Sequence, residues 1–391
     1  MKEFQITSFD QDIQKKAKLY IDEHMDELEK LIIELCKIPS PSNHEELRAD
    51  FCKNWFQQVG ANEVFIDDAF NVVCKVNCHN NKPKVLFMAH TDTVFPDTEP
   101  MPLYKESDKL YCPGVGDNTA NLAVLMLCTK FALENFSNGP GMLFVANSGE
   151  EGLGNLKGIR KLMEDYGDCI KNVISFDGTY GSICNKAVGS KRYKVEVRTE
   201  GGHSFGKFGN CNAIHYLASM ISTLYDVKVP QDGGSRTTYN VGIIGGGTSV
   251  NTIAEHAYML YEFRSDSRIC LDKMEKLFIS VIEAYRNMGV TVNFEVIGQR
   301  PCMGDIDAND FERLQKRVAA AAEKATNKAP TFRSSSTDCN IPLSMGIPAV
   351  STGTYLGDFS HTRNEFIYLS SLPAGFQLAM NVIISYLQET F

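Results

Sequence analysis

Three short apolar runs, far apart in the chain, each lead into acidic or histidine residues. The runs occupy residues 85–89, 142–146 and 173–176. Buried runs of this length are typical of central strands in an α/β sheet, and such sheets bind ligands outside the carboxyl ends of their strands. We therefore expect the polar residues that follow the runs to share one crevice: His90, Asp92, Glu150, Glu151 and Asp177.

This crevice would hold four carboxylates beside one imidazole. Carboxylates that converge repel one another unless cations lie between them. Imidazole and carboxylate groups are also common ligands of divalent metal ions. The sequence thus predicts a metal site rather than a bare acidic cluster.

Length and composition narrow the class of protein. A chain of 391 residues exceeds what one hydrophobic core usually supports, so we expect two domains. The formal net charge of -9 argues against nucleic acid or an anionic membrane as a partner. Residues 1–11 are polar and no apolar stretch is long enough to span a bilayer, so we expect a cytoplasmic protein. The twelve cysteines are scattered without a CxxC pair, which favours reduced, mostly buried thiols.

A segment of another kind interrupts the β/α pattern. Residues 191–297 are predicted to form a strand, a helix, two strands, a helix and a strand, which is the order of the split ferredoxin-like unit. The first domain would therefore be discontinuous, formed by residues 1–190 and 298–391, with an α+β domain inserted between its parts. Near the start of the chain, residues 13–36 carry apolar side chains at helical spacing.

The adjacent glutamates Glu150 and Glu151 are the most specific local signal. They follow a buried strand and a turn at Ser148 and Gly149. One glutamate can bind metal while the other, unligated, takes a proton from an activated water molecule. The alternative is a solvated charge pair that opens a helix, where the macrodipole favours acidic residues. The buried strand before the pair favours the first interpretation.

Three other positions each allow two interpretations. His90 and Asp92 start on the same side of a strand, so the carboxylate can accept the second N–H of a metal-binding imidazole; the alternative is a capped strand end with a surface histidine. Asp117 precedes an apolar helical run at residues 122–133 and is either a helix N-cap or a carboxylate that bridges two cations. His361 lies in a polar loop and is either solvated or a nitrogen ligand of a second metal.

Together the motifs resemble those of the M20 family of di-zinc metallopeptidases and deacylases, which includes peptidase T, glutamate carboxypeptidase, acetylornithine deacetylase and succinyl-diaminopimelate desuccinylase. The resemblance covers essentially the whole chain. Its motifs are Ile38-Pro39-Ser40, His90-Thr91-Asp92-Thr93, Gly116-Asp117-Asn118, Gly149-Glu150-Glu151-Gly152, Asp177-Gly178, Gly201-Gly202-His203-Ser204, the run from Gly245 to Asn251, and His361. The family often has Lys-Gly or Lys-Ala after its bridging aspartate, whereas this chain has Asn118-Thr119-Ala120, a difference that concerns the subfamily.

The resemblance implies roles for individual residues. One zinc ion would be bound by His90, Asp117 and Asp177, and the other by Asp117, Glu151 and His361. Asp92 would orient His90, and Glu150 would be the general base and acid. The resemblance also implies a zinc-peptidase-type α/β domain, with a mixed sheet flanked by helices, and a ferredoxin-like insertion that acts as lid and dimerisation domain.

The inserted domain would contribute three residues to substrate binding. His203 would polarise the scissile carbonyl, often across the dimer interface, while Asn251 and Arg264 would hold the substrate's carboxylate or backbone. For Arg264 the alternative is a strand residue that faces solvent. The loop Ser336-Thr337-Asp338 resembles a substrate-side loop of the family, and it is also a possible helix N-cap.

We therefore predict a two-zinc hydrolase, with cobalt or manganese as other possible metals, that cleaves an amide bond in short peptides with Glu150 as general base. The alternatives are an N-acyl amino acid deacylase and a catalytically inactive peptide-binding homologue. We expect a homodimer formed through the inserted domain. The sequence does not distinguish an aminopeptidase from a carboxypeptidase or a deacylase, because loops assemble the pocket.

Overall fold

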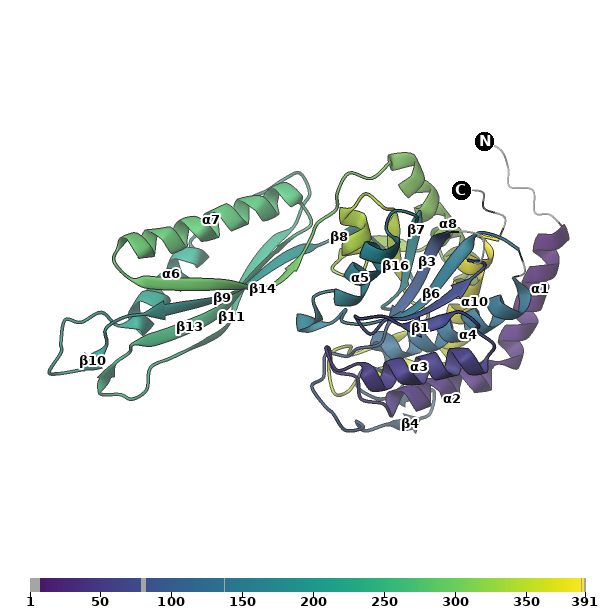
Figure 1. The fold of residues 1–391 in the computed structure, drawn as a ribbon, viewed down its shortest axis with the longest axis horizontal. Helices are drawn as coiled ribbons and strands as arrows, with labels where there is room; N and C mark the ends of the chain where they lie inside the picture. Colours follow the sequence, from purple (N-terminus) through teal and green to yellow (C-terminus); the bar gives the residue numbers. More distant parts are fainter. Residues whose placement is uncertain (1–7, 79–81, 137, 388, 390–391) are drawn as a thin grey trace. The chain divides into compact units, whose positions relative to one another are not determined.

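The computed structural model describes residues 8–78, 82–136, 138–387 and 389 (Figure 1). The chain divides into two compact units, one formed by Met1–Lys186 with Gly304–Phe391 and the other by Ala187–Met303. The insertion expected at residues 191–297 lies within the second unit. Each unit has a hydrophobic core of its own.

An eight-stranded sheet forms the centre of the first unit, in the order β1-β2-β6-β3-β7-β16-β8-β15. Strands β6, β3, β7 and β16 run parallel, whereas β2 and β8 are antiparallel to their neighbours, so the sheet is mixed. The strands are β1 (Val64–Ile66), β2 (Val72–Val76), β3 (Pro83–His90), β6 (Gly141–Asn147), β7 (Asn172–Phe176), β8 (Ser182–Ala187), β15 (Thr331–Ser335) and β16 (Ala349–Thr352). The three apolar runs are thus the adjacent strands β6, β3 and β7, as predicted.

Helices flank this sheet. They are α1 (Ser8–Glu23), α2 (Met25–Cys36), α3 (Glu46–Gln58), α4 (Asn121–Asn135), α5 (Lys157–Tyr166), α8 (Ala308–Thr326), α9 (Asn340–Ser344) and α10 (Leu372–Ile384). Helix α4 is apolar on nearly all sides and packs between β3 and the outer helices α2 and α10. A small sheet in the order β17-β18-β5-β4 joins two distant segments through β4 (Tyr104–Glu106), β5 (Lys109–Tyr111), β17 (Gly357–Asp358) and β18 (Phe366–Tyr368).

The helical spacing over residues 13–36 is confirmed, but the segment forms two helices, α1 and α2, which are separated at His24. The Nδ1 of His24 lies 2.7 Å from the carbonyl oxygen of Tyr20, and the imidazole stacks on the Tyr20 ring at 3.8 Å between centroids. The Tyr20 carbonyl also accepts the backbone N–H of His24 at 3.1 Å, so the side chain adds a second hydrogen bond in the last turn of α1. Helix α2 then starts at Met25.

A buried arginine fixes the end of β3 to helix α2. Arg48 on α3 is 2% exposed, and its Nη1 donates to the carbonyl oxygen of Thr91 at 2.8 Å. Its Nη2 donates to the carbonyl oxygens of Leu35 at 2.9 Å and Ile38 at 2.7 Å. These carbonyls lie at and just beyond the C-terminal end of α2, where helix carbonyls have few N–H partners, although that of Leu35 also accepts the N–H of Ile38 at 3.1 Å. Arg48 therefore holds the main chain of Thr91, the residue that follows His90, in place.

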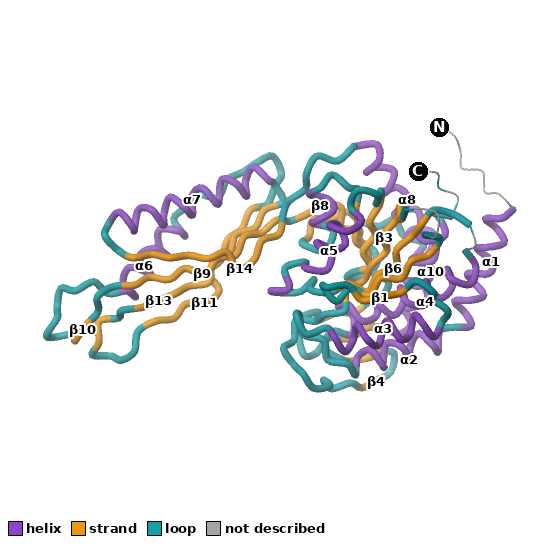
Figure 2. The backbone as a smooth tube through the Cα atoms, viewed as in Figure 1, coloured by secondary structure: helices purple, strands orange, loops and turns teal. Residues whose placement is uncertain are grey.

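The second unit has the order β-α-β-β-α-β expected for the inserted domain. Its antiparallel sheet has the order β11-β13-β9-β14, as in a ferredoxin-like fold. The elements are β9 (Gly189–Arg198), α6 (Ala213–Tyr225), β11 (Thr237–Gly246), β13 (His256–Ser265), α7 (Arg268–Asn287) and β14 (Thr291–Arg300). Burial alternates along β13, because one face of the sheet packs on the two helices (Figure 2). A short hairpin pairs β10 (Gly202–His203) with β12 (Thr252–Ile253).

Among the described residues, no helix combines the length and apolar character needed to cross a membrane. Residues 1–7, part of the polar start of the chain, lie outside the described residues. The cytoplasmic location stays a prediction.

Candidate metal centre

The parallel strands β3, β6 and β7 bring their carboxyl ends to one edge of the sheet. The pairing register places His90 beside Asn147, and the residues that follow each strand continue outward from this edge. His90 Nε2 lies 3.9 Å from Asp177 Oδ1, and possible ligand atoms of His90, Glu150 and Glu151 lie within 4.8 Å of one another. The side chains expected to share one crevice do so.

Two loops add Asp117 and His361 to this edge. The Oδ1 of Asp117 lies 3.2 Å from His90 Nε2, and its Oδ2 lies 3.0 Å from His361 Nε2. His361 Nε2 is also 3.1 Å from Glu151 Oε1. Asp117 therefore turns one carboxylate oxygen toward each of two groups of possible ligands. The groups are His90, Asp117 and Asp177, and Asp117, Glu151 and His361.

These are the two sets of ligands that the family resemblance implies. Each set offers one imidazole nitrogen and two carboxylate oxygens within 4.8 Å, a donor set that suits zinc, cobalt or manganese. A third grouping, of His90, Glu150 and Glu151, gives Glu150 a possible role as ligand as well. The ligand roles of the individual side chains stay predictions.

Electrostatics at the centre favour cations. Hydrogen bonds to Asp117 and Glu151 raise the pKa of His361 to about 11. Burial acts to lower the pKa of His90, but its contacts with Asp117 and Asp92 outweigh burial and hold that pKa well above the usual value. Protons on these two imidazoles offset the carboxylates around them. Divalent ions would do the same with more charge.

The pKa values of the two aspartates that face Nε2 of His90 are shifted in opposite directions. Burial and the neighbouring Asp117 carboxylate raise the pKa of Asp177 to about 6. Burial acts in the same direction on Asp117, yet the hydrogen bonds from His361 and His90 outweigh it and hold the pKa of Asp117 well below its usual range. The site thus favours the charged form of Asp117, as suits a group shared by two cations.

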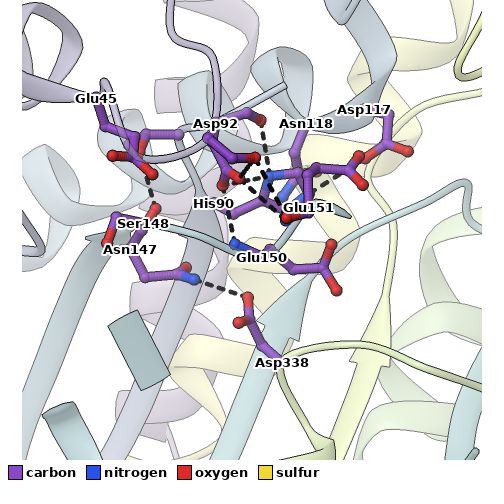
Figure 3. Close-up of polar contacts among 12 residues, drawn as sticks. Glu45, His90, Asp92, Asp117, Asn118, Asn147, Ser148, Glu150, Glu151 and Asp338 are labelled. Carbon is purple, nitrogen blue, oxygen red and sulfur yellow. Dashed lines mark hydrogen bonds and ion pairs between the residues drawn. The ribbon is translucent and has the colours of Figure 1, made fainter. Parts of the chain in front are cut away.

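The carboxylate of Asp92 holds the backbone of both glutamates (Figure 3). Its Oδ1 accepts the N–H of Glu150 at 3.0 Å, and its Oδ2 accepts the N–H of Glu151 at 3.0 Å. The Ser42 hydroxyl donates to Oδ2 at 2.7 Å. The Nδ1 of His90 is nearer to the backbone oxygen of Asp92, at 3.0 Å, than to its carboxylate, at 3.5 Å. Asp92 therefore orients His90 mainly through its main chain, while its side chain fixes the pair of glutamates.

The alternatives weighed for two motifs do not apply. Glu150 and Glu151 are 6% and 5% exposed, so they are not a solvated charge pair. Asp117 does not cap α4, because the helix begins at Asn121 with Ala120 as its N-cap. Asp117 instead lies in an irregular turn, with φ -103° and ψ 85°.

Two glycines allow the chain to reach this turn. Gly114 has φ +78°, and a Cβ there would lie 2.6 Å from Cγ2 of Thr93. A Cβ on Gly116 would lie 2.5 Å from the hydroxyl oxygen of Tyr355. Side chains at either position would push the loop away from the sheet edge.

Sequence reasoning does not assign the contacts of Ser42 and Asn147. The only signal for Ser42 is the Pro-Ser-Pro-Ser run at residues 39–42. Asn147, the last residue of β6, donates from Nδ2 to Oδ2 of the buried Asp338 at 2.7 Å (Figure 3). Burial raises the pKa of Asp338 to about 7. Asp338 therefore contacts the strand end beside His90 and does not cap α9, whose N-cap is Cys339.

The predicted substrate-binding residues lie in the second unit. His203 is exposed on β10, next to Asn251, whose backbone oxygen accepts the N–H of Ser204 at 2.9 Å. Arg264 lies on β13 and donates from Nε and Nη2 to the two carboxylate oxygens of Glu262, at 3.0 and 3.1 Å. Asn251 precedes β13 and Arg264 is near its far end, so on the order of 25 Å of strand separates them within one chain. One subunit cannot bring both to the same carboxylate.

Comparisons with known proteins show what the chain is similar to. The family model described as "Peptidase family M20/M25/M40" matches residues 86–385. Succinyl-diaminopimelate desuccinylase of Corynebacterium glutamicum is 24% identical over 350 residues, which cover 85% of this chain and 89% of that protein. The aminopeptidase PepT of Bacillus cereus has a TM-score of 0.71 at 22% identity, covering 93% of this chain and 98% of that one. YXEP of Bacillus subtilis, described as a dinuclear metal-binding peptidase, has a TM-score of 0.62 at 14% identity, covering 94% and 100%.

We predict that metal binding releases protons. Both imidazoles have raised pKa values and carry protons near neutral pH, whereas a metal requires the unprotonated nitrogen. Apparent metal affinity should therefore rise with pH between about 6 and 9. Calorimetric titration of the chelator-treated protein in buffers of different ionisation enthalpy should show roughly two protons released, one from each imidazole. His361→Ala should release about one proton fewer, and proton release unchanged in that variant would contradict the assignment.

Proposed function

The chain belongs to peptidase family M20/M25/M40, and on that premise we propose that it is a two-metal hydrolase that cleaves an amide bond in short peptides. The observation that supports this proposal most is the carboxylate of Asp117, whose two oxygens face two separate groups of ligands. A site for a single metal ion does not require a carboxylate shared between two groups of ligands. A buried pair of glutamates lies directly beside it.

Two divalent ions, zinc in our proposal, would be held by His90, Asp117 and Asp177 and by Asp117, Glu151 and His361. When bound, they would supply the Lewis acidity that activates a water molecule and polarises the scissile carbonyl.

Glu150 is the general base and then the general acid in this proposal. It takes a proton from the attacking water and returns it to the leaving amine nitrogen. Asp92 fixes its backbone N–H, so the position of the Glu150 carboxylate depends only on the side-chain torsions. Its low exposure keeps bulk water from competing for the proton.

Exchange of each glutamate for glutamine tests these roles. Glu150→Gln should keep both metals and lower kcat roughly 10²- to 10⁴-fold, because an amide of the same size cannot accept the proton. Glu151→Gln should lose metal from one site. Metal content and kcat should be measured together. Glu164→Gln, which changes an exposed side chain on α5, is the control. Loss of metal in Glu150→Gln would instead favour its role as ligand.

We propose that the second unit forms a homodimer and supplies His203 to the partner's metal centre. The separation of Asn251 from Arg264 supports this arrangement, because two subunits are needed for both to hold one substrate. Strand β11 is the edge of its sheet, and Ile243 and Ile244 on it are about half exposed. Such an apolar sheet edge suits a subunit interface.

Mixing two inactive variants tests the role of His203. His203→Ala and Glu150→Gln should each be inactive alone. A mixed dimer should have about a half of wild-type activity, because one of its two centres is intact. A statistical mixture, in which about half of the dimers are mixed, should have about a quarter. The composition of the dimers should be verified by native mass spectrometry. Mixed dimers without activity would place His203 in its own subunit's centre.

For the substrate we propose a short peptide with a free α-carboxylate bound by Arg264 and Asn251. The fork of Arg264 already binds Glu262, so the carboxylate must compete with Glu262 or bind through Nη1. The similarity to a desuccinylase favours a second candidate, an N-acyl amino acid with the same carboxylate. The complete set of ligand types and Glu150 argue against an inactive peptide-binding homologue.

Amidated substrates test the carboxylate. A panel of dipeptides, tripeptides and N-acyl amino acids should be compared with the matching C-terminal amides by mass spectrometry. Amidation should lower kcat/KM roughly 10- to 100-fold in the wild type, as expected for loss of a charge-assisted hydrogen bond, and much less in Arg264→Ala. Arg198→Ala, an exposed change on the same sheet, should behave like the wild type. If amidation has no effect, recognition of the free amine becomes the better hypothesis.

A further inference from the structure

We propose that Glu365 is a positioning residue that holds the loop carrying Asp117 in place for both metal ions. This inference rests on the two-metal function proposed above. Glu365 is 1% exposed, and its carboxylate accepts three backbone N–H groups of the loop. Oε2 accepts from Gly114 at 2.7 Å, while Oε1 accepts from Gly116 at 2.9 Å and from Asp117 at 2.8 Å.

The same segment that carries Glu365 also carries His361, four residues earlier. The backbone oxygen of Glu365 accepts the N–H of Cys112 at 3.2 Å, and directly beyond this contact β18 pairs with β5. At the far end of this segment His361 Nε2 lies 3.0 Å from Asp117 Oδ2. Residues 361–365 therefore position His361 directly and Asp117 through Glu365.

A carboxylate is the group that this loop requires. Three N–H groups converge on it, so each oxygen has to be an acceptor, and an amide would turn an NH2 group toward at least one of them. A further buried acid beside a cluster of carboxylates is unfavourable by charge alone. The three backbone donors offset part of that charge, and the carboxylate in turn fixes the geometry of the loop.

Asp108 provides a matched control at the opposite end of the same pair of strands. Its Oδ1 accepts the backbone N–H of Ser370 at 2.9 Å, so it too joins the β5 segment to the β18 segment through a carboxylate. The change Asp108→Asn is chemically the same as Glu365→Gln, but it lies at the end of the strands away from Asp117. A role limited to joining the strands would give the two variants the same properties.

The test is zinc affinity, measured for chelator-treated full-length protein by competition with a chromophoric chelator. Wild type and Asp108→Asn should each bind two zinc ions, and the affinities of the variant should equal those of the wild type. In Glu365→Gln both affinities should fall by about 10- to 100-fold, the usual effect of a residue that orients ligands, because Asp117 belongs to both sites. The absorption bands of the cobalt-substituted protein, which report ligand geometry, should change in Glu365→Gln and stay as in the wild type for Asp108→Asn.

If Glu365→Gln fails to fold, Glu365→Asp keeps the charge with a shorter reach and should show the same changes to a smaller degree. Thermal unfolding of the metal-free proteins separates lost folding from lost metal. Wild-type affinity and an unchanged cobalt spectrum in a folded Glu365 variant would overturn the proposal while leaving the two-metal function intact. A wild type that binds fewer than two zinc ions would overturn both.

Discussion

The structure of the first unit depends on holding several carboxylates together at one edge of a sheet. Like charges in a poorly solvated crevice repel, so each acid needs a donor or a cation. Two imidazoles lie among Asp117, Glu151 and Asp177, while backbone N–H groups and the side chains of Ser42 and Asn147 donate to other acids nearby. Asp92 accepts the amides of the paired glutamates, and Glu365 accepts three amides of the Asp117 loop. Carboxylates that keep their charge in such a crevice are suited to binding divalent cations.

Chemistry and recognition are divided between the two units. The possible metal ligands and Glu150 all belong to the unit with the mixed sheet, where they follow parallel strands or, for Asp117 and His361, lie on loops at the same edge. The proposed recognition residues belong to the ferredoxin-like unit, where Asn251 precedes β13 and Arg264 lies near its far end. An arrangement of this kind leaves the hydrolytic site constant while substrate preference varies with loops and with subunit assembly. It also explains why possible ligands were easier to assign from motifs than specificity.

Much of the fold follows from patterns that are local in sequence. Runs that are largely apolar predict β3, β6 and β7, because strands covered on both faces have few polar positions. Alternation along β13 and helical spacing in α6 and α7 predict the second unit. The helical spacing over residues 13–36 does not show that the segment forms two helices, because the pattern of apolar residues continues across His24.

The sequence by itself determined which residue types can bind metal and at which strand ends they lie. His90, Asp117, Glu150, Glu151, Asp177 and His361 stand in motifs whose side chains carry the chemistry. Only the tertiary structure decided how they are held. Hydrogen bonds join residues that lie 50 to 251 positions apart in the sequence. They link Asp92 to the glutamates, Ser42 to Asp92 and Glu365 to the Asp117 loop. Most of these contacts go to backbone amides, which every residue except proline possesses, so no pattern of side chains can reveal them.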